Sequence, residues 1–379
     1  TRNTYASLAG NSGQGSLAHV LDTVRTEATG DLETALLRVD NMNLAGVRDA
    51  LGDMAPGIEV AARRALADLP HAETTAILER LEDHVFHMPQ IRHSPAQNAE
   101  SAPDYAVWGN IAVSAGIQDA DDVAPELATQ TTNSFLGVEK THGHWTTGLT
   151  TALLQHCLNS RDDDSRATIT SVRAYLHTIW RQHLRDAGPY VAASLGAGRS
   201  RVTTVRDISF LDTDADAQHW ARDVSLGLGA GHVFTPGAWR IHPHLKLSGV
   251  LVREDAVEEG GAQTMNLDID SGDIASVHST LGLRMGRTMA MDTVSIFPEA
   301  HVQWMHTLSS DLDQVHTRFD TFGPDFAIAS TATRDSLRMG AGVMLSTKNL
   351  HGGMRYEYSS HDGGDIKEHA LNLELRFLF

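Results

Sequence analysis

The sequence predicts an all-β membrane protein: a 12-stranded antiparallel up-and-down transmembrane β-barrel with a preceding α-helical segment. Three observations predict this fold. Polar and apolar side chains alternate with a period of two from residue 105 to the end of the 379-residue chain. The connections between the predicted strands alternate in length. The polar face of strand after strand carries Arg, Lys, His and Glu, which a small dry core would hold only at a high cost in free energy.

The composition excludes several other classes of protein. The chain is 41% hydrophobic, has a formal charge of −18 and contains one cysteine, Cys157. One cysteine cannot form a disulfide framework and supplies too few ligands for a Cys-based zinc or iron–sulfur site. The acidic balance argues against a nucleic-acid partner. No run of about 18 apolar residues is present for a transmembrane helix, whereas a barrel strand needs only about ten residues of alternating polarity.

The first quarter of the chain has a helical pattern, because apolar side chains recur at spacings of three and four across residues 15–87. Glycines and prolines divide this segment into short helices. The longest predicted helix covers residues 58–86, with a break or kink near Pro70. A linker rich in Pro, Ser, Asn and Ala follows at residues 93–104.

Twelve strand candidates follow the linker. They lie at residues 105–116, 133–140, 144–156, 167–180, 188–199, 220–232, 238–252, 274–287, 293–307, 334–347, 349–359 and 367–379. The connections after the odd-numbered strands are mostly long and acidic, and those after the even-numbered strands are short. The long connections lie around Asp121, Asp163, Asp212, Glu258, Phe319 and Asp362. A β-sandwich has no reason to place its long loops on one side, whereas a barrel with short periplasmic turns and long external loops does.

The two faces of the strands indicate a lipid-facing exterior. In the seventh predicted strand, Trp239, Leu245 and Leu251 share one face, and Arg240 and Lys246 share the other. A water-soluble barrel would have an apolar lumen and a polar exterior. The sequence therefore predicts a wide, water-filled lumen.

The last strand ends in a row of alternating apolar residues. This row consists of Leu371, Leu373, Leu375, Phe377 and Phe379. It resembles the C-terminal signal by which the barrel assembly machinery recognises outer-membrane proteins of Gram-negative bacteria. An ordinary amphipathic last strand would have the same alternation, although it would end on phenylalanine only by chance.

The chain as a whole resembles the translocator (β) domain of type V autotransporters. The resemblance is carried by motifs in the barrel region and by one in the helical segment. They are Trp108-Gly109, Gly188-Pro189-Tyr190, Glu259-Gly260-Gly261-Ala262, Ser279 to Arg284, Phe297-Pro298-Glu299-Ala300, Trp304-Met305-His306, Gly340-Ala341-Gly342-Val343 and Met54-Ala55-Pro56-Gly57. Each motif is loose by itself, and their order and spacing make the match.

The resemblance implies a division of the chain and a function. Residues 1–57 would be a helical linker that follows a missing passenger, residues 58–104 a pore helix and linker, and residues 105–379 the translocator barrel. The barrel would insert into the outer membrane and mediate export of the N-terminal passenger to the cell surface. No cofactor is implied, and any catalytic activity would reside in the passenger.

The resemblance also implies partners and a location. The partners would be outer-membrane lipid and lipopolysaccharide, the barrel assembly machinery, periplasmic chaperones and the chain's own passenger. The barrel would be a monomer in the outer membrane of a Gram-negative bacterium, with both of its termini in the periplasm. The acidic external loops would either bridge divalent cations to lipopolysaccharide phosphates or keep the outer face hydrated.

The family leaves a helix inside the pore, and the residues supply a physical reason for it here. A helix about 10 Å across needs space in the lumen, and inward glycines would provide it, or would relieve barrel curvature. The predicted pore-lining residues are Arg173, Arg240, Lys246, Arg284, Arg338, Arg355, Gly227, Gly229, Gly282, Gly340 and Gly342. The acidic residues Glu73, Glu79, Glu82 and Asp83 of the helix would face this basic wall.

Motifs that would carry catalysis or bind a metal are sparse. His142 and His144 flank Gly143 at a turn, but no third ligand is evident, so no metal site is predicted. Glu299 and His301 share a face and are interpreted as lumen lining rather than as an acid/base pair. Two alternatives remain open: a porin-like channel, which would need an open lumen, and an outer-membrane barrel enzyme of the protease or phospholipase type.

Overall fold

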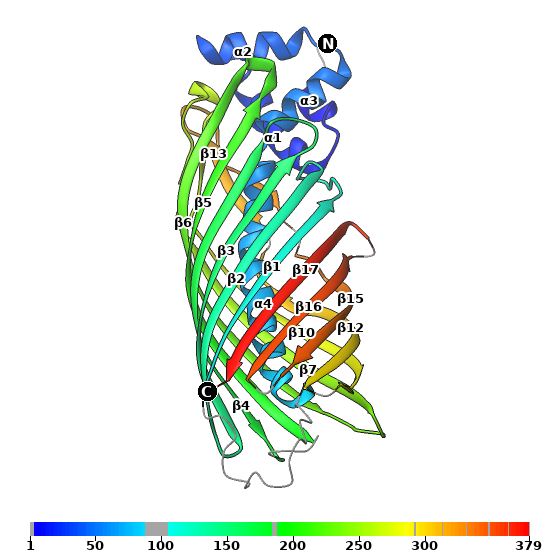
Figure 1. The fold of residues 1–379 in the computed structure, drawn as a ribbon. Helices are drawn as coiled ribbons and strands as arrows, with labels where there is room; N and C mark the ends of the chain where they lie inside the picture. Colours follow the sequence, from blue (N-terminus) through cyan, green and yellow to red (C-terminus); the bar gives the residue numbers. More distant parts are fainter. Residues whose placement is uncertain are drawn as a thin grey trace.

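The computed structural model describes residues 4–378 except 88–104, 184–187 and the single positions 292, 313, 331, 348 and 363. It consists of a tall barrel, a long helix inside the barrel and three short helices at one end (Figure 1). The N-terminus lies with the short helices, and the C-terminus lies at the opposite end of the barrel.

The helices precede the barrel in the chain. They are η1 (Tyr5–Ser7), α1 (Ser12–Val24), α2 (Asp31–Asp40), α3 (Leu44–Met54) and α4 (Gly57–Phe86). The side chains of Asn11 and Asn43 accept hydrogen bonds from backbone N–H groups in the first turns of α1 and α3, the usual role of an N-cap residue. None of the described helices is long and apolar enough to cross a membrane.

The longest helix, α4, differs from the sequence-based expectation at Pro70. It continues through this proline as one helix of 30 residues, so the break considered there does not occur. A proline inside a helix removes one backbone hydrogen bond and costs about 3 kcal/mol. The barrel surrounds α4 and buries most of its residues, and this packing offsets the loss.

The barrel is a closed antiparallel sheet, as predicted. Its strands are β1 (Tyr105–Gln118), β2 (Leu127–His142), β3 (Trp145–Ser160), β4 (Arg166–Arg181), β5 (Pro189–Ile208), β6 (Thr213–His232), β7 (Trp239–Glu254), β10 (Gly272–Arg287), β12 (Val294–Ser310), β15 (Asp335–Ser346), β16 (Leu350–His361) and β17 (Ile366–Leu378). Each strand pairs with its neighbour in the chain, and β1 pairs with β17 to close the ring. A short extra strand, β11 (Met289–Met291), pairs with β12 beside the turn. The prediction of a 12-stranded barrel preceded by a helical segment is confirmed.

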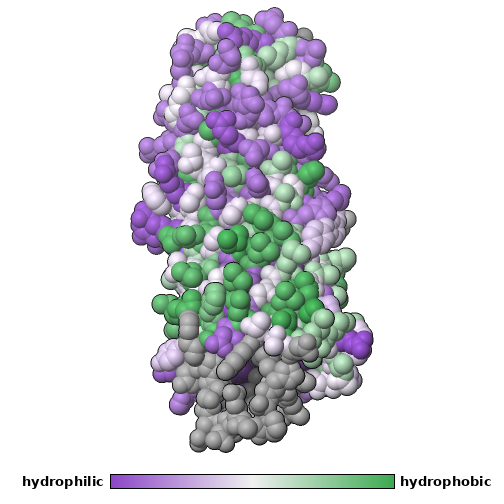
Figure 2. Space-filling view, in the orientation of Figure 1, coloured by the Kyte–Doolittle hydropathy of each residue, from purple (hydrophilic) through white to green (hydrophobic). Residues whose placement is uncertain are grey.

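The outer surface is divided into an apolar belt and a polar end. Figure 2 shows the apolar side chains gathered around the half of the barrel near the C-terminus, with polar side chains above them. Leu136, Leu149, Leu195 and Leu245 belong to the large apolar residues that point outward and are exposed. A band of this kind is what the hydrocarbon core of a bilayer requires.

Several strands are longer than the sequence indicated. The strand β5 continues to Ile208 and β6 begins at Thr213, so only the short turn η2 (Ser209–Leu211) and Asp212 connect them. The prediction of a long loop around Asp212 is therefore wrong. Likewise, the connection after β3 has only five residues, 161–165. Above the apolar belt both faces of a strand are polar or covered by protein, so the lipid-facing alternation that marks a strand is lost there.

The connections after β7 and β12 do form long excursions, and these pair into a second, small sheet. Its strands are β8 (Val257–Glu258), β9 (Leu267–Ile269), β13 (Gln314–Phe319) and β14 (Phe326–Ala329), with η3 (Gln263–Met265) between β8 and β9. This sheet and the extended ends of β5 and β6 pack against residues 5–54, which we call the helical cap. Leu17, Leu51, Met265 and Phe319 are buried in their shared core.

Candidate functional site: the helix-filled lumen

The lumen is occupied along its length by α4, which packs against β3 to β7 and β10. The helix has no single apolar stripe, and its buried residues lie on all sides. A helix of this type is expected where protein surrounds it. Its polar side chains must then find partners on the barrel wall, because an unpaired buried charge is costly.

The middle of α4 is held by Glu73. Its Oε1 lies 3.2 Å from Arg173 Nη1, and its Oε2 accepts a hydrogen bond of 2.9 Å from the Tyr175 hydroxyl. Arg173 also contacts Asp223 at 3.0 Å. Glu73, Arg173 and Tyr175 are all buried. The predicted acidic residue of the helix and the predicted basic residue of the wall therefore meet here as partners.

Six and nine residues further along α4, Glu79 and Glu82 contact the same cation. The Lys246 ammonium lies 3.2 Å from Glu79 and 3.3 Å from Glu82. Gln303 donates a hydrogen bond of 2.8 Å to Glu79, and Arg338 lies 3.8 Å from the same oxygen. Arg338 thus makes the loosest of these contacts.

Near its end, α4 contacts a chain of alternating charges. Asp83 lies 2.6 Å from Arg284, which contacts Glu299 at 2.8 Å. Arg355 pairs with Glu299 at 2.8 Å rather than with a carboxylate of the helix. Glu299 therefore neutralises two lumenal arginines, which agrees with its interpretation as lumen lining and gives it a specific electrostatic role.

The C-terminus of α4 is capped by arginines from the wall. Arg240 donates hydrogen bonds of 2.9 Å to the carbonyl oxygens of Val85 and Phe86, and Arg181 donates one of 3.3 Å to that of His84. The last carbonyls of a helix have no partner within the helix and carry its negative dipole end. Sequence patterning placed Arg240 on the inward face but did not reveal that its partners are backbone atoms.

The helix also carries basic residues that face acidic residues of the wall. The sequence did not predict these contacts. Arg80 pairs with Glu139 at 2.9 Å and with Glu374 at 3.4 Å, and Arg63 pairs with Glu254 at 3.3 Å. The picture of an acidic helix in a basic lumen is therefore incomplete, because both surfaces carry both signs. The sequence signal for these pairs was the spacing of the arginines, which lie three or four positions from acidic residues of the same helix.

The lumenal glycines serve two different purposes. A Cβ on Gly227 would lie 2.6 Å from Thr74 Cγ2, so this glycine leaves room for α4, whereas one on Gly229 would lie 3.8 Å from Leu78, an ordinary contact distance. Gly282 instead accommodates the ring of His244, Gly340 that of His301, and Gly342 the backbone and side chain near Arg355. For these three, the atoms nearest to an added Cβ belong to neighbouring strands of the wall and not to the helix.

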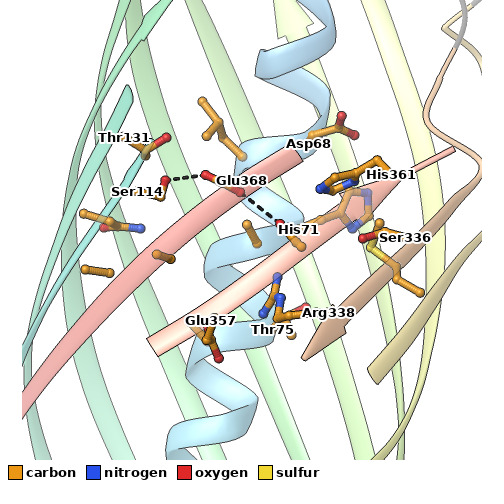
Figure 3. Close-up of a pocket in the computed structure, with 18 of the residues that line it drawn as sticks. Asp68, His71, Thr75, Ser114, Thr131, Ser336, Arg338, Glu357, His361 and Glu368 are labelled. Carbon is orange, nitrogen blue, oxygen red and sulfur yellow. Dashed lines mark hydrogen bonds between the residues drawn. The ribbon is translucent and has the colours of Figure 1, made fainter. Parts of the chain in front are cut away.

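One side of the lumen is not filled by α4. A cavity of about 550 Å³ lies between the helix and the wall formed by β1, β2, β12 and β15 to β17, with a few lining residues from β3 and β10. Figure 3 shows Asp68, His71 and Thr75 of the helix on one side of it, and Glu357 and Glu368 of the wall on the other. The cavity extends to Asp119 and Asp121 in the connection after β1, and to Asp362 and Asp365 in the connection after β16.

The mouth of the barrel is joined to the helical cap by a buried ion pair. Arg206 donates hydrogen bonds to the Glu259 carboxylate and to the carbonyl oxygens of Asp53 and Met265. Burial, together with the carboxylates of Asp163 and Asp207, raises the pKa of Asp53 to about 7. Through its hydrogen bonds, Arg206 connects a barrel strand to the second sheet and to α3.

The row of apolar residues in the last strand faces outward. Leu371, Leu373, Leu375 and Phe377 are exposed on β17 at the apolar belt, and Phe379 lies outside the described residues.

Comparison with known proteins identifies the class of this barrel. The family model described as the autotransporter beta-domain matches residues 107–357. A search of curated proteins found no match. Among solved structures, the chain is similar to the translocator domain of the autotransporter NalP from Neisseria meningitidis, with a TM-score of 0.61 and 16% identity over 83% of this chain and 99% of that one.

Two further solved structures have the same fold. The beta domain of the Bordetella autotransporter BrkA aligns with a TM-score of 0.56 and 16% identity, covering 73% of this chain and 100% of that one. The transport unit of AIDA-I from Escherichia coli aligns with a TM-score of 0.52 and 13% identity, covering 81% and 99%. With a family model that matches most of its barrel, the chain belongs to the autotransporter beta-domain family.

Proposed function

We propose that this outer-membrane barrel exports a passenger attached before residue 1, and that α4 remains in the lumen as a plug after export. The observation that carries the proposal is the path of the chain. It runs from the helical cap at one end, through the lumen as α4, to β1 and the C-terminus at the other end. A segment joined to the cap would therefore lie across the membrane from the C-terminus.

The proposal includes an orientation. The polar end with the helical cap faces the exterior, and the barrel termini face the periplasm. Two features support it: the apolar belt lies toward the C-terminus (Figure 2), and the long excursions after β7 and β12 lie at the other end, packed against the helical cap. Transmembrane barrels of this type have their longer loops on the outside.

We further propose how the barrel reaches the membrane. The barrel assembly machinery recognises the outward row Leu371, Leu373, Leu375, Phe377 and Phe379, after periplasmic chaperones deliver the chain. The barrel works as a monomer among outer-membrane lipid and lipopolysaccharide. It transports without catalysing a reaction, and any enzymatic activity belongs to the passenger.

Export is tested with a reporter domain fused before residue 1. The reporter should become accessible to added protease on intact cells. The double substitution Leu375→Asp and Phe377→Asp should abolish this accessibility and leave the chain in the periplasm, because charges on the lipid face oppose insertion. A reporter that stays protected in the unmodified fusion would refute the export proposal.

Retention of α4 is tested with a disulfide between the helix and the wall. In a Cys157→Ser background, cysteines replace Thr74 and Gly227, whose positions are in direct contact. The matched control pairs Thr74→Cys with Gly249→Cys, since a Cβ at Gly249 would meet no described atom within 4 Å. Surface-displayed protein should form the first disulfide and not the second. Absence of the first disulfide in displayed protein would show that α4 leaves the lumen.

A further inference from the structure

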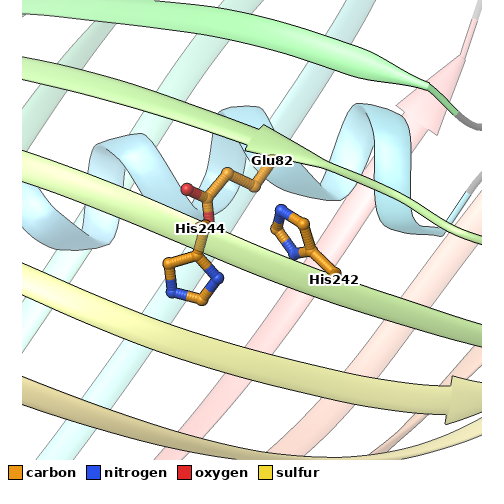
Figure 4. A group of neighbouring side chains, drawn as sticks. All are labelled: Glu82, His242 and His244. Atoms are coloured by element: carbon orange, nitrogen blue, oxygen red, sulfur yellow. The ribbon is translucent and has the colours of Figure 1, made fainter.

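A group of three side chains at the lower part of the lumen has the composition of a metal site. Glu82 comes from α4, and His242 and His244 come from β7, where alternate residues point inward (Figure 4). One potential ligand atom from each lies within 4.8 Å of the others. The exposed fractions of Glu82, His242 and His244 are 1%, 0% and 3%.

The donor atoms of this group have few other partners. Glu82 Oε1, His242 Nδ1 and both ring nitrogens of His244 are buried without a hydrogen-bond partner among the described residues. Buried polar atoms are normally paired, and an unpaired one costs about 1–3 kcal/mol. A single bound ion would satisfy three of them: Glu82 Oε1, His242 Nδ1 and one ring nitrogen of His244.

The barrel wall leaves room for these side chains. A Cβ on Gly282 of β10 would lie 2.2 Å from His244 Nε2, so only glycine admits the imidazole ring there. On β6, a Cβ on Gly229 would lie 3.9 Å from Glu82 Oε1. His244 is thus seated between strands whose facing positions lack side chains.

The neighbouring groups suit a bound cation. The Tyr190 hydroxyl lies 2.8 Å from His242 Nε2, which orients this ring and leaves Nδ1 for a metal. Lys246 contacts Glu82 through Oε2, not through the unpartnered Oε1, and it is also neutralised by Glu79. Because Arg338 also lies 3.8 Å from Glu79, Lys246 and Arg338 balance the two carboxylates, and the ion would bind through the unpartnered donor atoms.

We propose that Glu82, His242 and His244 bind a zinc ion, which pins α4 to β7. Two imidazoles and one carboxylate are a frequent ligand set for zinc, with a fourth position for water. Ligand atoms around a tetrahedral zinc lie about 3.3 Å apart. The observed spacing, within 4.8 Å, is wider than this value, so binding would draw the three side chains closer together. The ion would join a residue of the helix to two of the wall, a contact that is independent of the ion pairs.

The test uses the full chain, stripped with a chelator, refolded in detergent with zinc chloride and then desalted. Zinc per chain is measured by mass spectrometry, and folding by the mobility of unheated samples on gels. The unmodified chain should retain about one zinc ion. His244→Ala and Glu82→Gln should each retain at least about tenfold less at equal folding. Cobalt in place of zinc should give the visible absorption of a tetrahedral site only in the unmodified chain.

A matched control separates this site from the other buried histidines. His177 of β4 is 1% exposed and faces the lumen, where its Nε2 lies 2.9 Å from the Thr150 hydroxyl. His177→Ala should keep the zinc of the unmodified chain. If the unmodified folded chain retains no zinc, or if His244→Ala and Glu82→Gln retain as much as His177→Ala, the proposal is wrong. The measurement does not depend on export, so its failure would leave the proposed function standing.

Discussion

The two sides of α4 meet very different surroundings. On the side of β3 to β7 and β10, the helix packs directly on the wall, and its contacts include buried ion pairs with Arg173 and Lys246. On the side of β1 and β15 to β17, a cavity of about 550 Å³ separates helix and wall for part of the length. The difference teaches that the helix packs closely along one arc of the barrel, whereas on the other arc its contacts, such as the pairs of Arg80 with Glu139 and Glu374, leave a cavity beside them.

The largest effect is expected from removing the helix, because this removes the contacts on both sides of it. Deleting residues 58–104 should open a much larger pore, because the helix fills most of the lumen. The pore should prefer anions, because Glu73, Glu79, Glu82 and Asp83 leave while their partners Arg173, Lys246 and Arg284 stay. Conductance and reversal potential in planar bilayers measure both effects. Unchanged conductance would mean that α4 does not block the lumen.

Removing single charges should distinguish the packed side from the open side. Arg284→Ala leaves the buried carboxylates of Asp83 and Glu299 without their shared partner and should cost about 3–5 kcal/mol. Arg338→Ala, whose cation is 3.8 Å from Glu79 beside the cavity, should cost about 0–1 kcal/mol. Unfolding in urea, followed by tryptophan fluorescence, measures both variants. If both variants lose the same amount of stability, the two sides of α4 do not differ as described.

A smaller effect is expected from a methyl group placed between helix and wall. Gly227→Ala should destabilise the barrel by about 1–3 kcal/mol, since its Cβ would overlap Thr74 and Ser194. Gly249→Ala is the control on the outer face, where a Cβ meets no described atom within 4 Å, and it should be neutral or slightly stabilising. The same urea titration compares them, and a neutral Gly227→Ala would show that the helix can shift at no cost.

The last prediction concerns the helical cap, which lies beyond both sides of the lumen. The pKa of Asp53 is raised from 3.8 to about 7, so the folded cap prefers the neutral carboxyl. Its contribution to stability is complete below about pH 4 and is lost as the pH rises to about 7. Hydrogen exchange in α3 should therefore be faster at about pH 8 than at about pH 5, after correction for intrinsic rates.

The control for this pH effect is Asp53→Asn, which keeps the side-chain shape and removes the titration. The variant should lose most of the pH dependence in α3, and exchange in α4 should not change. If the pH dependence persists unchanged in Asp53→Asn, another group is responsible for it. Glu59 is such a group, because burial and the neighbouring Glu259 also raise its pKa.

The barrel could be predicted from the sequence because a bilayer imposes a strict alternation on each strand. The outward residues of β7 and β17 and the inward Arg173 and Arg284 follow from this period alone. The ends of β5 and β6 were missed because the alternation disappears above the apolar belt. The pairing of Arg80 with Glu139, and of Arg240 with backbone carbonyls, depends on how far α4 is rotated and inserted, which no local pattern records. The same holds for Glu82, His242 and His244, which come from segments 160 positions apart.

The position of the helical cap has a mechanical consequence. Three packed helices, each about 10 Å across with side chains, are bulkier than a lumen that already holds one helix. The cap at one end of α4 and the barrel strands at the other end both prevent the helix from sliding along the lumen. Sliding back would first require the core around Leu17, Leu51 and Phe319 to come apart. Return of α4 through the lumen would therefore cost the free energy of unfolding the cap.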